Sequence, residues 1–195
     1  MFTGIIEATG TIRRITGGRS LKMTIECPAI LGDVKLGDSI AVDGTCLTVT
    51  HFTAETFDVD IITGTSDRTK FSAAQAGFTV NLERALMPSS RMGGHFVTGH
   101  IDKVAKVMRT FRQDNATVCH ISLAPDDQPY IIDKGSIAVD GTSLTVFKLA
   151  PNYFEVQLIP ETQRQTKLMQ LKPGDAVHLE FDMLGKYVLK QKERV

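Results

Sequence analysis

The segment Ile40-Ala-Val-Asp-Gly-Thr-Cys-Leu-Thr-Val49 decides the fold, because it returns as Ile137-Ala-Val-Asp-Gly-Thr-Ser-Leu-Thr-Val146. The two segments lie 97 positions apart and differ only at Cys46, which is Ser143 in the second copy. A period of this length is too long for a solenoid repeat, so each copy is expected to form a domain with its own core. The sequence therefore predicts one fold used twice, with a pair of related sites.

The repeat extends in both directions from this segment. The same offset of 97 pairs Phe57 with Phe154, Val59 with Val156, Thr65 with Thr162 and Glu83 with Glu180. At the start of each copy, Thr3-Gly-Ile-Ile-Glu7 resembles Thr98-Gly-His-Ile-Asp102 at an offset of 95. Turn-forming residues fill Met87–Gly94 between the copies. We therefore expect a first domain at 1–90, a second at 91–183 and a C-terminal helix or tail at 184–195.

Short alternating segments predict an all-β fold. Apolar and polar residues alternate in Leu21–Ile25 and Phe57–Ile61, and Asp43-Gly44 is typical of a tight hairpin turn. Strands separated by about 8–12 residues favour a small barrel or sandwich. Helix-permissive stretches are limited to about Ser66–Ala76 and Glu161–Leu171, with Pro160 well placed at a helix start.

Composition excludes several function classes. The chain of 195 residues carries 22 basic and 22 acidic residues, so its zero formal charge gives no support for nucleic-acid binding. It lacks an apolar run of about 20 residues for a membrane helix, and residues 1–7 lack the features of a secretory signal. Cys27, Cys46 and Cys119 are widely spaced and indicate reduced thiols. We expect a cytoplasmic protein without nucleic-acid or membrane partners.

Hydroxyl or thiol side chains recur at three equivalent positions of the repeated segment. They are Thr45, Cys46 and Thr48 in the first copy, and Thr142, Ser143 and Thr145 in the second. These positions predict a polar wall in each copy, and ordinary strand hydroxyls are the alternative. Ser143 is not in a Gly-x-Ser-x-Gly context, so a nucleophilic serine is not indicated. Phosphate-binding glycine loops are also missing from the sequence.

Two histidines stand out in Gly93-Gly-His-Phe-Val-Thr-Gly-His-Ile-Asp102. On a strand, His95 and His100 would point to opposite faces, which makes them a poor metal-binding pair, so no metal site is expected. Either imidazole could act as an acid or base near neutral pH, and a structural hydrogen-bonding role is the alternative. The equivalent of His100 in the first copy is Ile5, so the two copies share a framework and differ at this position.

Together these motifs resemble the riboflavin synthase alpha-chain family. The matching stretches are Met1–Glu7, Gly37–Thr50, Val80–Leu86, Gly93–Asp102 and Leu158–Thr162, and the resemblance covers essentially the whole chain in order. It implies two six-stranded Greek-key barrels, a C-terminal helix, a homotrimer, and lumazine synthase as a candidate partner.

The resemblance also implies a reaction. Two 6,7-dimethyl-8-ribityllumazine molecules would exchange a four-carbon unit, giving riboflavin and 5-amino-6-ribitylaminouracil with no metal or redox cofactor. Each barrel would bind one lumazine. The working site would form between the amino-terminal barrel of one subunit and the carboxy-terminal barrel of the next.

The family's binding residues carry over onto matching positions. The amino-terminal pocket is expected to use Gly4, Ile5, Ile6, Cys46, Leu47, Thr48, Asp60, Ile61, Ile62, Thr63, Gly64 and Thr65. The carboxy-terminal pocket is expected to use Gly99, His100, Ile101, Lys134, Ser143, Leu144, Thr145, Gln157, Leu158, Ile159, Pro160, Glu161 and Thr162. Catalytic roles are expected for Cys46, Thr145, His100, Ser143, Phe2 and Asp182.

Specific roles follow from the same resemblance. His100 and Ser143 would handle proton transfer and activation of water or hydroxyl. Cys46 and Thr48 would hold the second lumazine. Phe2 would cover the site, and Asp182 would assist at the subunit contact.

One departure and one rival bear on this expectation. The family usually carries Pro-Glu-Thr in both copies, and here the first copy reads Thr63-Gly64-Thr65, which removes a carboxylate from the amino-terminal pocket. A non-catalytic antenna protein that binds lumazine or flavin is the main alternative, and the lost glutamate favours it. The histidines, Cys46 and Ser143 favour catalysis. The flavin-binding barrel of ferredoxin-reductase-like enzymes would need an Arg-x-Tyr-Ser motif, which the sequence lacks.

Overall fold

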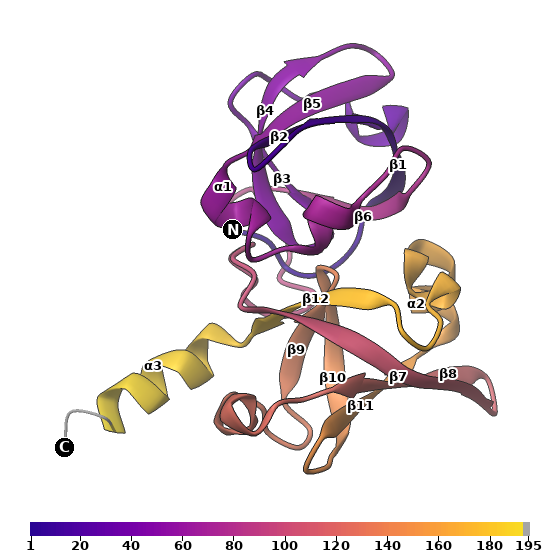
Figure 1. Cartoon of the computed structure of the whole chain (residues 1–195), viewed down its shortest axis with the longest axis vertical. Coiled ribbons are helices and arrows are strands. Elements are labelled where there is room, and N and C mark those ends of the chain that lie inside the picture. The colour runs from indigo at the N-terminus through magenta and orange to yellow at the C-terminus, as the bar shows by residue number, and fades with distance from the viewer. Residues whose placement is uncertain (193–195) are drawn as a thin grey trace.

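The two copies form two closed six-stranded antiparallel barrels, stacked along the long axis of the molecule (Figure 1). The structure, a computed structural model, describes residues 1–192. The strands of the first barrel are β1 (Ala8–Gly17), β2 (Leu21–Glu26), β3 (Ser39–Val42), β4 (Thr45–Phe52), β5 (Thr56–Ile61) and β6 (Thr79–Arg84). Those of the second are β7 (Lys103–Gln113), β8 (Ala116–Ser122), β9 (Ser136–Val139), β10 (Thr142–Leu149), β11 (Tyr153–Leu158) and β12 (Ala176–Phe181).

Both barrels have the same Greek-key order. The first closes as β1-β2-β5-β4-β3-β6, and the second has the equivalent order with each strand number raised by six. Even the bulges repeat, since the register of β4 shifts between Val49 and His51 and that of β10 between Val146 and Lys148. The all-β duplicated fold expected from the sequence is confirmed.

Each barrel is filled by the inward side chains of its own strands. Ile12, Phe57 and Leu82 belong to one buried cluster, and Val107, Phe154 and Leu179 to another. This separation follows from strand alternation, because every second residue of a half-buried strand faces the interior. A third small cluster, which contains Phe2, Ala41, Val97 and Ala138, joins the barrels.

The repeated Asp-Gly dipeptides form the β3–β4 and β9–β10 turns. Asp43 and Gly44 both have positive φ, 45° and 81°, as the primed two-residue hairpin requires. The turns also touch each other, since a Cβ built on Gly44 would lie 2.7 Å from the backbone nitrogen of Gly141, and the converse distance is also 2.7 Å. The repeated segments therefore meet tip to tip on a local twofold axis.

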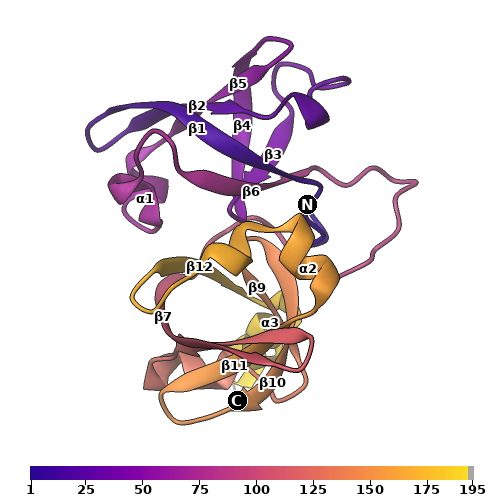
Figure 2. The same cartoon turned by 90° about the vertical axis from the view of Figure 1, so that its right-hand side faces the viewer.

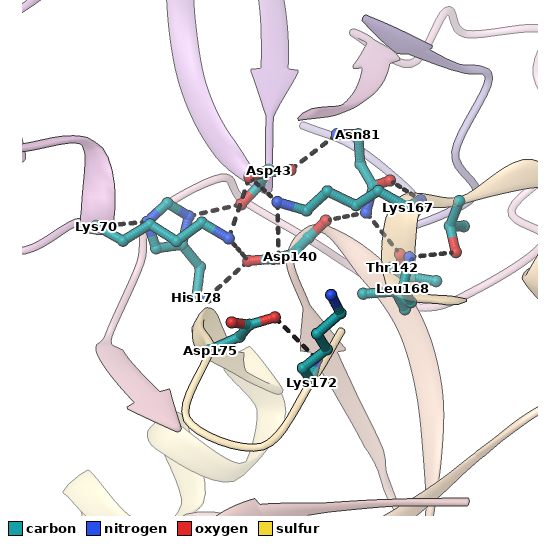
Figure 3. A network of polar contacts seen from close by, with 11 residues as sticks. Asp43, Lys70, Asn81, Asp140, Thr142, Lys167, Leu168, Lys172, Asp175 and His178 are labelled. Carbon is teal, nitrogen blue, oxygen red and sulfur yellow. Dashed lines mark hydrogen bonds and ion pairs between the residues drawn. The ribbon is translucent and has the colours of Figure 1, made fainter. Parts of the chain in front are cut away.

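A buried polar network surrounds this contact (Figure 3). The Lys167 Nζ lies 2.5 Å from Asp43 Oδ2 and 3.1 Å from Asp140 Oδ2. The Lys70 Nζ lies 2.5 Å from Asp140 Oδ1 and 3.1 Å from Asp43 Oδ2. Burial raises the pKa of Asp140, but the Lys167 and Lys70 ammonium groups outweigh burial and hold that pKa below its ordinary value.

Asn81 and His178 complete the network at equivalent positions. The Asn81 amide donates to the carbonyl of Asp140 at 2.9 Å, and its Oδ1 accepts from the Lys167 backbone N–H at 2.9 Å. His178 makes the equivalent pair of contacts in the other half. Its Nδ1 lies 2.8 Å from the Asp43 carbonyl oxygen, and its Nε2 accepts from the Lys70 backbone N–H at 2.9 Å. Paired charges, and hydrogen bonds that are repeated in both halves, make this buried interface specific in geometry.

The helical segments are shorter than the sequence predicts. The expected helix at Ser66–Ala76 is α1 (Thr63–Ser66) followed by the 3₁₀ turn η2 (Lys70–Ala73). The expected helix at Glu161–Leu171 is α2 (Pro160–Gln165), which Pro160 does begin, followed by the 3₁₀ turn η4 (Lys167–Gln170). Two further 3₁₀ turns are η1 (Pro28–Ile30) and η3 (Pro125–Tyr130).

The C-terminal helix α3 (Met183–Lys192) projects from the second barrel, away from the first (Figure 1). Asp182 begins it by accepting the Leu184 backbone N–H at 2.9 Å. The last part of the expected tail, 193–195, lies outside the described residues. Among the described helices, none has the length and apolar character that crossing a membrane requires.

Candidate functional site: two crossed half-sites

The predicted polar wall divides by strand alternation. Cys46 and Thr48 lie on the outward face of β4, where Cys46 is half-buried and Thr48 is exposed. Thr45 is buried, and Leu47 lies in the barrel core. The wall therefore keeps two of its three residues on the first barrel, and the Leu47 side chain cannot line a pocket on the outer surface.

The second barrel repeats this arrangement. Ser143 is half-buried and Thr145 exposed on the outward face of β10, and Leu144 lies in the core. The Thr142 hydroxyl instead accepts the Asn81 amide at 3.3 Å in the network between the barrels.

The segment before each barrel crosses to the other barrel. We call Phe2–Ile6 and Val97–Ile101 the lead segments. They pair with each other through Phe2 N–H to Val97 O at 2.7 Å and Val97 N–H to Phe2 O at 3.1 Å. Figure 2 shows the linker from β6 looping out to one side before the chain returns to the second barrel.

The crossing exchanges the partners that the sequence predicts. Gly4 was expected beside Cys46, and its carbonyl instead accepts the Ser143 N–H of the second barrel at 2.8 Å. The Gly99 carbonyl likewise accepts the Cys46 N–H of the first barrel at 2.8 Å. Both contacts require glycine, because a Cβ on Gly4 would lie 2.6 Å from Ser143 Cβ. The repeat shows which residues are equivalent, and it does not show which barrel a lead segment contacts.

Two composite surfaces result. The first half-site combines Cys46 and Thr48 with Gly99–Ile101, and the second combines Ser143 and Thr145 with Gly4–Ile6. His100 is exposed in the first half-site, and Ile5 is 49% exposed in the second. The Ile6 and Ile101 side chains are buried. Within one chain, His100 and Ser143 therefore belong to different half-sites.

His95 contacts Ser143, a pairing that the repeat does not predict. Its Nδ1 lies 2.7 Å from the Ser143 hydroxyl oxygen. The imidazole is 9% exposed, and its Nε2 has no hydrogen-bond partner among the described residues. Burial lowers the pKa of His95, so the ring is neutral at pH 7 and can accept the Ser143 proton or donate to the hydroxyl oxygen. The Gly-Gly-His motif singles out His95 in the sequence, but it does not indicate that Ser143 is its hydrogen-bond partner.

Phe2 corrects a second expectation. Its side chain is 0% exposed and packs between the barrels with Ala41, Val97 and Ala138, so it cannot cover a site as a lid. Its place is that of an anchor for the first lead segment. Asp182 is half-buried at the start of α3, and the structure shows it capping that helix.

The remaining predicted residues lie in the last two positions of β5 and β11 and just after them. The Ile61 and Leu158 side chains belong to the cores of the two barrels. The exposed residues of this set are Asp60, Ile62 and Gly64 on the first barrel, and Ile159, Pro160 and Glu161 on the second. Thr63, Thr65, Gln157 and Thr162 are half-buried.

The first barrel has a shallow cleft at these positions. Asp60, Ile61 and Ile62 line a shallow cleft of about 270 Å³ with the β1–β2 hairpin. On the second barrel, Lys134 has a positive φ of 63°, and its Nζ donates to the Phe147 carbonyl at 3.0 Å above that aromatic ring.

Comparisons with known proteins match both barrels. The family described as "Lumazine binding domain" matches residues 3–85 and again 98–182. Riboflavin synthase from Bacillus subtilis is 44% identical over 191 residues, covering 97% of this chain and 89% of that protein. Riboflavin synthase from Schizosaccharomyces pombe is 42% identical over 198 residues, covering 99% of this chain and 94% of that protein.

Solved structures give the same fold. LumP in complex with 6,7-dimethyl-8-(1'-D-ribityl) lumazine has a TM-score of 0.84 at 25% identity, covering 93% of this chain and 99% of that one. LumP in complex with riboflavin has a TM-score of 0.85 at 26% identity over the same shares. With its two lumazine-binding domains and its full-length similarity to the curated enzymes, the chain belongs to the riboflavin synthase family.

Proposed function

We propose that this chain converts two molecules of 6,7-dimethyl-8-ribityllumazine into riboflavin and 5-amino-6-ribitylaminouracil by transfer of a four-carbon unit. The two products together contain all the atoms of the two substrates. The reaction therefore needs no oxidant, reductant or resident cofactor. The similarity to riboflavin synthases over 97% of the chain supports this reaction class.

The observation that carries the proposal is the pair of equivalent but unequal half-sites. Two identical substrate molecules need two similar binding surfaces, and the duplication supplies them. One molecule must donate carbon atoms and the other accept them, so the surfaces must also differ. They differ at Cys46 against Ser143 and at Ile5 against His100. They differ also in the contact of Ser143 with His95, which has no counterpart at Cys46 among the described residues.

Most of the rate enhancement would come from holding two lumazines face to face. Orientation of two bound reactants can remove about 7–11 kcal/mol of a bimolecular barrier. The acidic 7-methyl group of lumazine then needs only a modest base and a stabilised anion. We assign proton transfer to His100 and to Ser143 with its neighbour His95, and binding of the second lumazine to Cys46 and Thr48.

The working site in this proposal forms between subunits. Contact of the first half-site of one subunit with the second half-site of the next would bring His100 and Ser143 together. A homotrimer closed in this way has three such sites. Leu184, Tyr187 and Val188 of α3 are 62%, 66% and 55% exposed, and they supply apolar surface for the assembly. The proposal also assigns a cytoplasmic location, with lumazine synthase as a partner.

Incubation with the lumazine tests the proposal. Riboflavin absorbance should appear, at a rate proportional to protein concentration above the trimer dissociation range. Stoichiometric binding without riboflavin would instead identify a lumazine- or flavin-binding antenna protein. The similarity of the fold to LumP supports this second candidate. The enzyme is favoured because the chain is 44% identical to a riboflavin synthase and 25% identical to LumP.

A further inference from the structure

Each barrel contains a buried carboxylate that forms no salt bridge within residues 1–192. Glu83 of β6 is 4% exposed, and Glu180 at the equivalent position of β12 is 2% exposed. Burying an unpaired carboxylate is costly unless hydrogen-bond donors compensate for lost water. The groups that compensate therefore show what each carboxylate holds in place.

Glu83 binds the first lead segment. Its Oε1 accepts the Thr3 backbone N–H at 2.6 Å and the Thr3 hydroxyl at 2.7 Å. Its Oε2 accepts the Gly4 N–H at 2.9 Å. All three donors belong to the segment that crosses to Ser143.

Glu180 binds the second lead segment in the same way. Its Oε1 accepts the Thr98 N–H at 2.6 Å and the Thr98 hydroxyl at 2.7 Å, and its Oε2 accepts the Gly99 N–H at 2.9 Å. The Gly99 carbonyl then accepts the Cys46 N–H, and the next residue is His100. A single residue, Gly99, thus joins the carboxylate of the second barrel to the half-site of the first.

The position of Glu83 within its own barrel makes the crossing informative. Glu83 pairs with Ala41 on β3, and Ala41 pairs with Cys46 on β4, so these residues form one row across three strands. Proximity within the barrel would therefore link Glu83 to Cys46. Its hydrogen bonds link it instead to Gly4, and through Gly4 to Ser143 of the other barrel.

We infer that Glu180 is a positioning residue for His100 in the first half-site, and that Glu83 performs the equivalent task for Ile5 in the second half-site. The inference rests on the proposed function. A residue that served only to stabilise its own barrel would have no such crossed effect.

The test uses the full chain and the matched variants Glu180→Gln and Glu83→Gln. Glutamine keeps the size of the side chain, but it removes the charge and turns a donor toward the lead segment. Amide exchange measured by NMR should show the Cys46 N–H exchanging about tenfold faster or more in Glu180→Gln, as expected for loss of a charge-assisted hydrogen bond. The Ser143 N–H should be unchanged in that variant, and Glu83→Gln should give the reverse pattern.

The coupling of each glutamate variant to His100→Ala, measured on kcat, is the readout that a purely structural role would leave unchanged. Glu180→Gln should lower kcat, and His100→Ala should cost less in the Glu180→Gln background than in the wild type, because both changes affect one imidazole. The losses in kcat from Glu83→Gln and from His100→Ala should instead multiply in the double variant, because Glu83 does not position the His100 imidazole. Equal, multiplicative losses for both glutamate variants would overturn the inference, as would unchanged Cys46 exchange in Glu180→Gln.

Milder variants keep the test available if the glutamines prevent folding. Thr98→Val removes the hydroxyl bond to Glu180, and Thr3→Val removes the hydroxyl bond to Glu83 together with the one that the hydroxyl accepts from the Ile5 N–H. Both leave the carboxylate in place, and they should show the same crossed pattern with smaller changes. If the wild type makes no riboflavin, the proposed function fails. The amide-exchange comparison then still decides whether each carboxylate orders the half-site of the opposite barrel.

Discussion

His178 is the residue at which the matched halves of the interbarrel network differ most, since Asn81 has the equivalent place. Because the Asp43 carbonyl can only accept, Nδ1 carries the proton, and Nε2 accepts from the Lys70 backbone N–H. Protonation would remove that acceptor and add a cation. Burial and the nearby Lys70 ammonium group therefore lower the pKa of His178 to about 4, although Asp140 and Asp43 oppose the shift.

This lowered pKa predicts how stability depends on pH. Between pH 6.5 and about 4, the histidine binds a proton in the unfolded chain but stays neutral in the folded protein. Its contribution is therefore complete above pH 6.5 and is lost as pH falls toward 4, by about 3 kcal/mol for such a shift. Denaturant unfolding across this range should show a steeper acid loss in the wild type than in His178→Asn, which keeps the Asn81 type of hydrogen bonding. Equal pH slopes would contradict the assignment.

Sequence reasoning at the level of single residues was strongest for turns and weakest for partners. Asp43-Gly44 was predicted correctly, because two positive φ angles at a hairpin restrict the residues locally. Asp43 also pairs with Lys167, 124 positions away, and no local rule gives that contact. The offset of 97 that relates Lys70 to Lys167 was a usable signal, since equivalent charges in both copies often share a structural role.

Among the elements, the β3–β4 and β9–β10 hairpins carry the strictest steric demand. Gly44→Ala should be destabilising in two ways, through positive φ at about 1–2 kcal/mol and through overpacking against Gly141 at about 1–3 kcal/mol. Gly77→Ala is the matched control, because its φ is 92° and a Cβ there would meet nothing within 4 Å. The free energy of unfolding of the two variants should therefore differ. Equal losses would mean that the tip-to-tip contact is loose.

The short helices show where element prediction failed. Thr69 and Thr166 are extended, with ψ of 164° and 159°, and each separates an α-helical turn from a 3₁₀ turn. The Thr166 hydroxyl donates to the Thr162 carbonyl and accepts the Leu168 N–H, so the side chain replaces the helical backbone bonds at this break. The composition of the two segments favours a helix. The side-chain hydrogen bonds that end the helix cannot be predicted from the spacing of apolar residues.

At the scale of the whole molecule, the proposed trimer makes α3 the element to test. Glutamates at Leu184 and Val188 should shift the mass in sedimentation from trimer to monomer and reduce riboflavin formation in proportion, because apolar surface would be replaced by charge. Leu36→Glu, at a residue 65% exposed on the first barrel, is the control. An unchanged mass in the α3 variant would place the subunit contact elsewhere.

The tip-to-tip glycines, the paired lead segments and the exchanged carboxylate contacts share one geometry, in which each contact made by one barrel is returned by the other. Such isologous contacts are those of a twofold dimer. The chain can thus be understood as a fused dimer whose ancestor, a single barrel, exchanged its leading residues with an identical copy. In that ancestor both surfaces would have been the same by symmetry. Fusion released them from this constraint, and the two lead segments were then free to differ, as they do at Ile5 and His100.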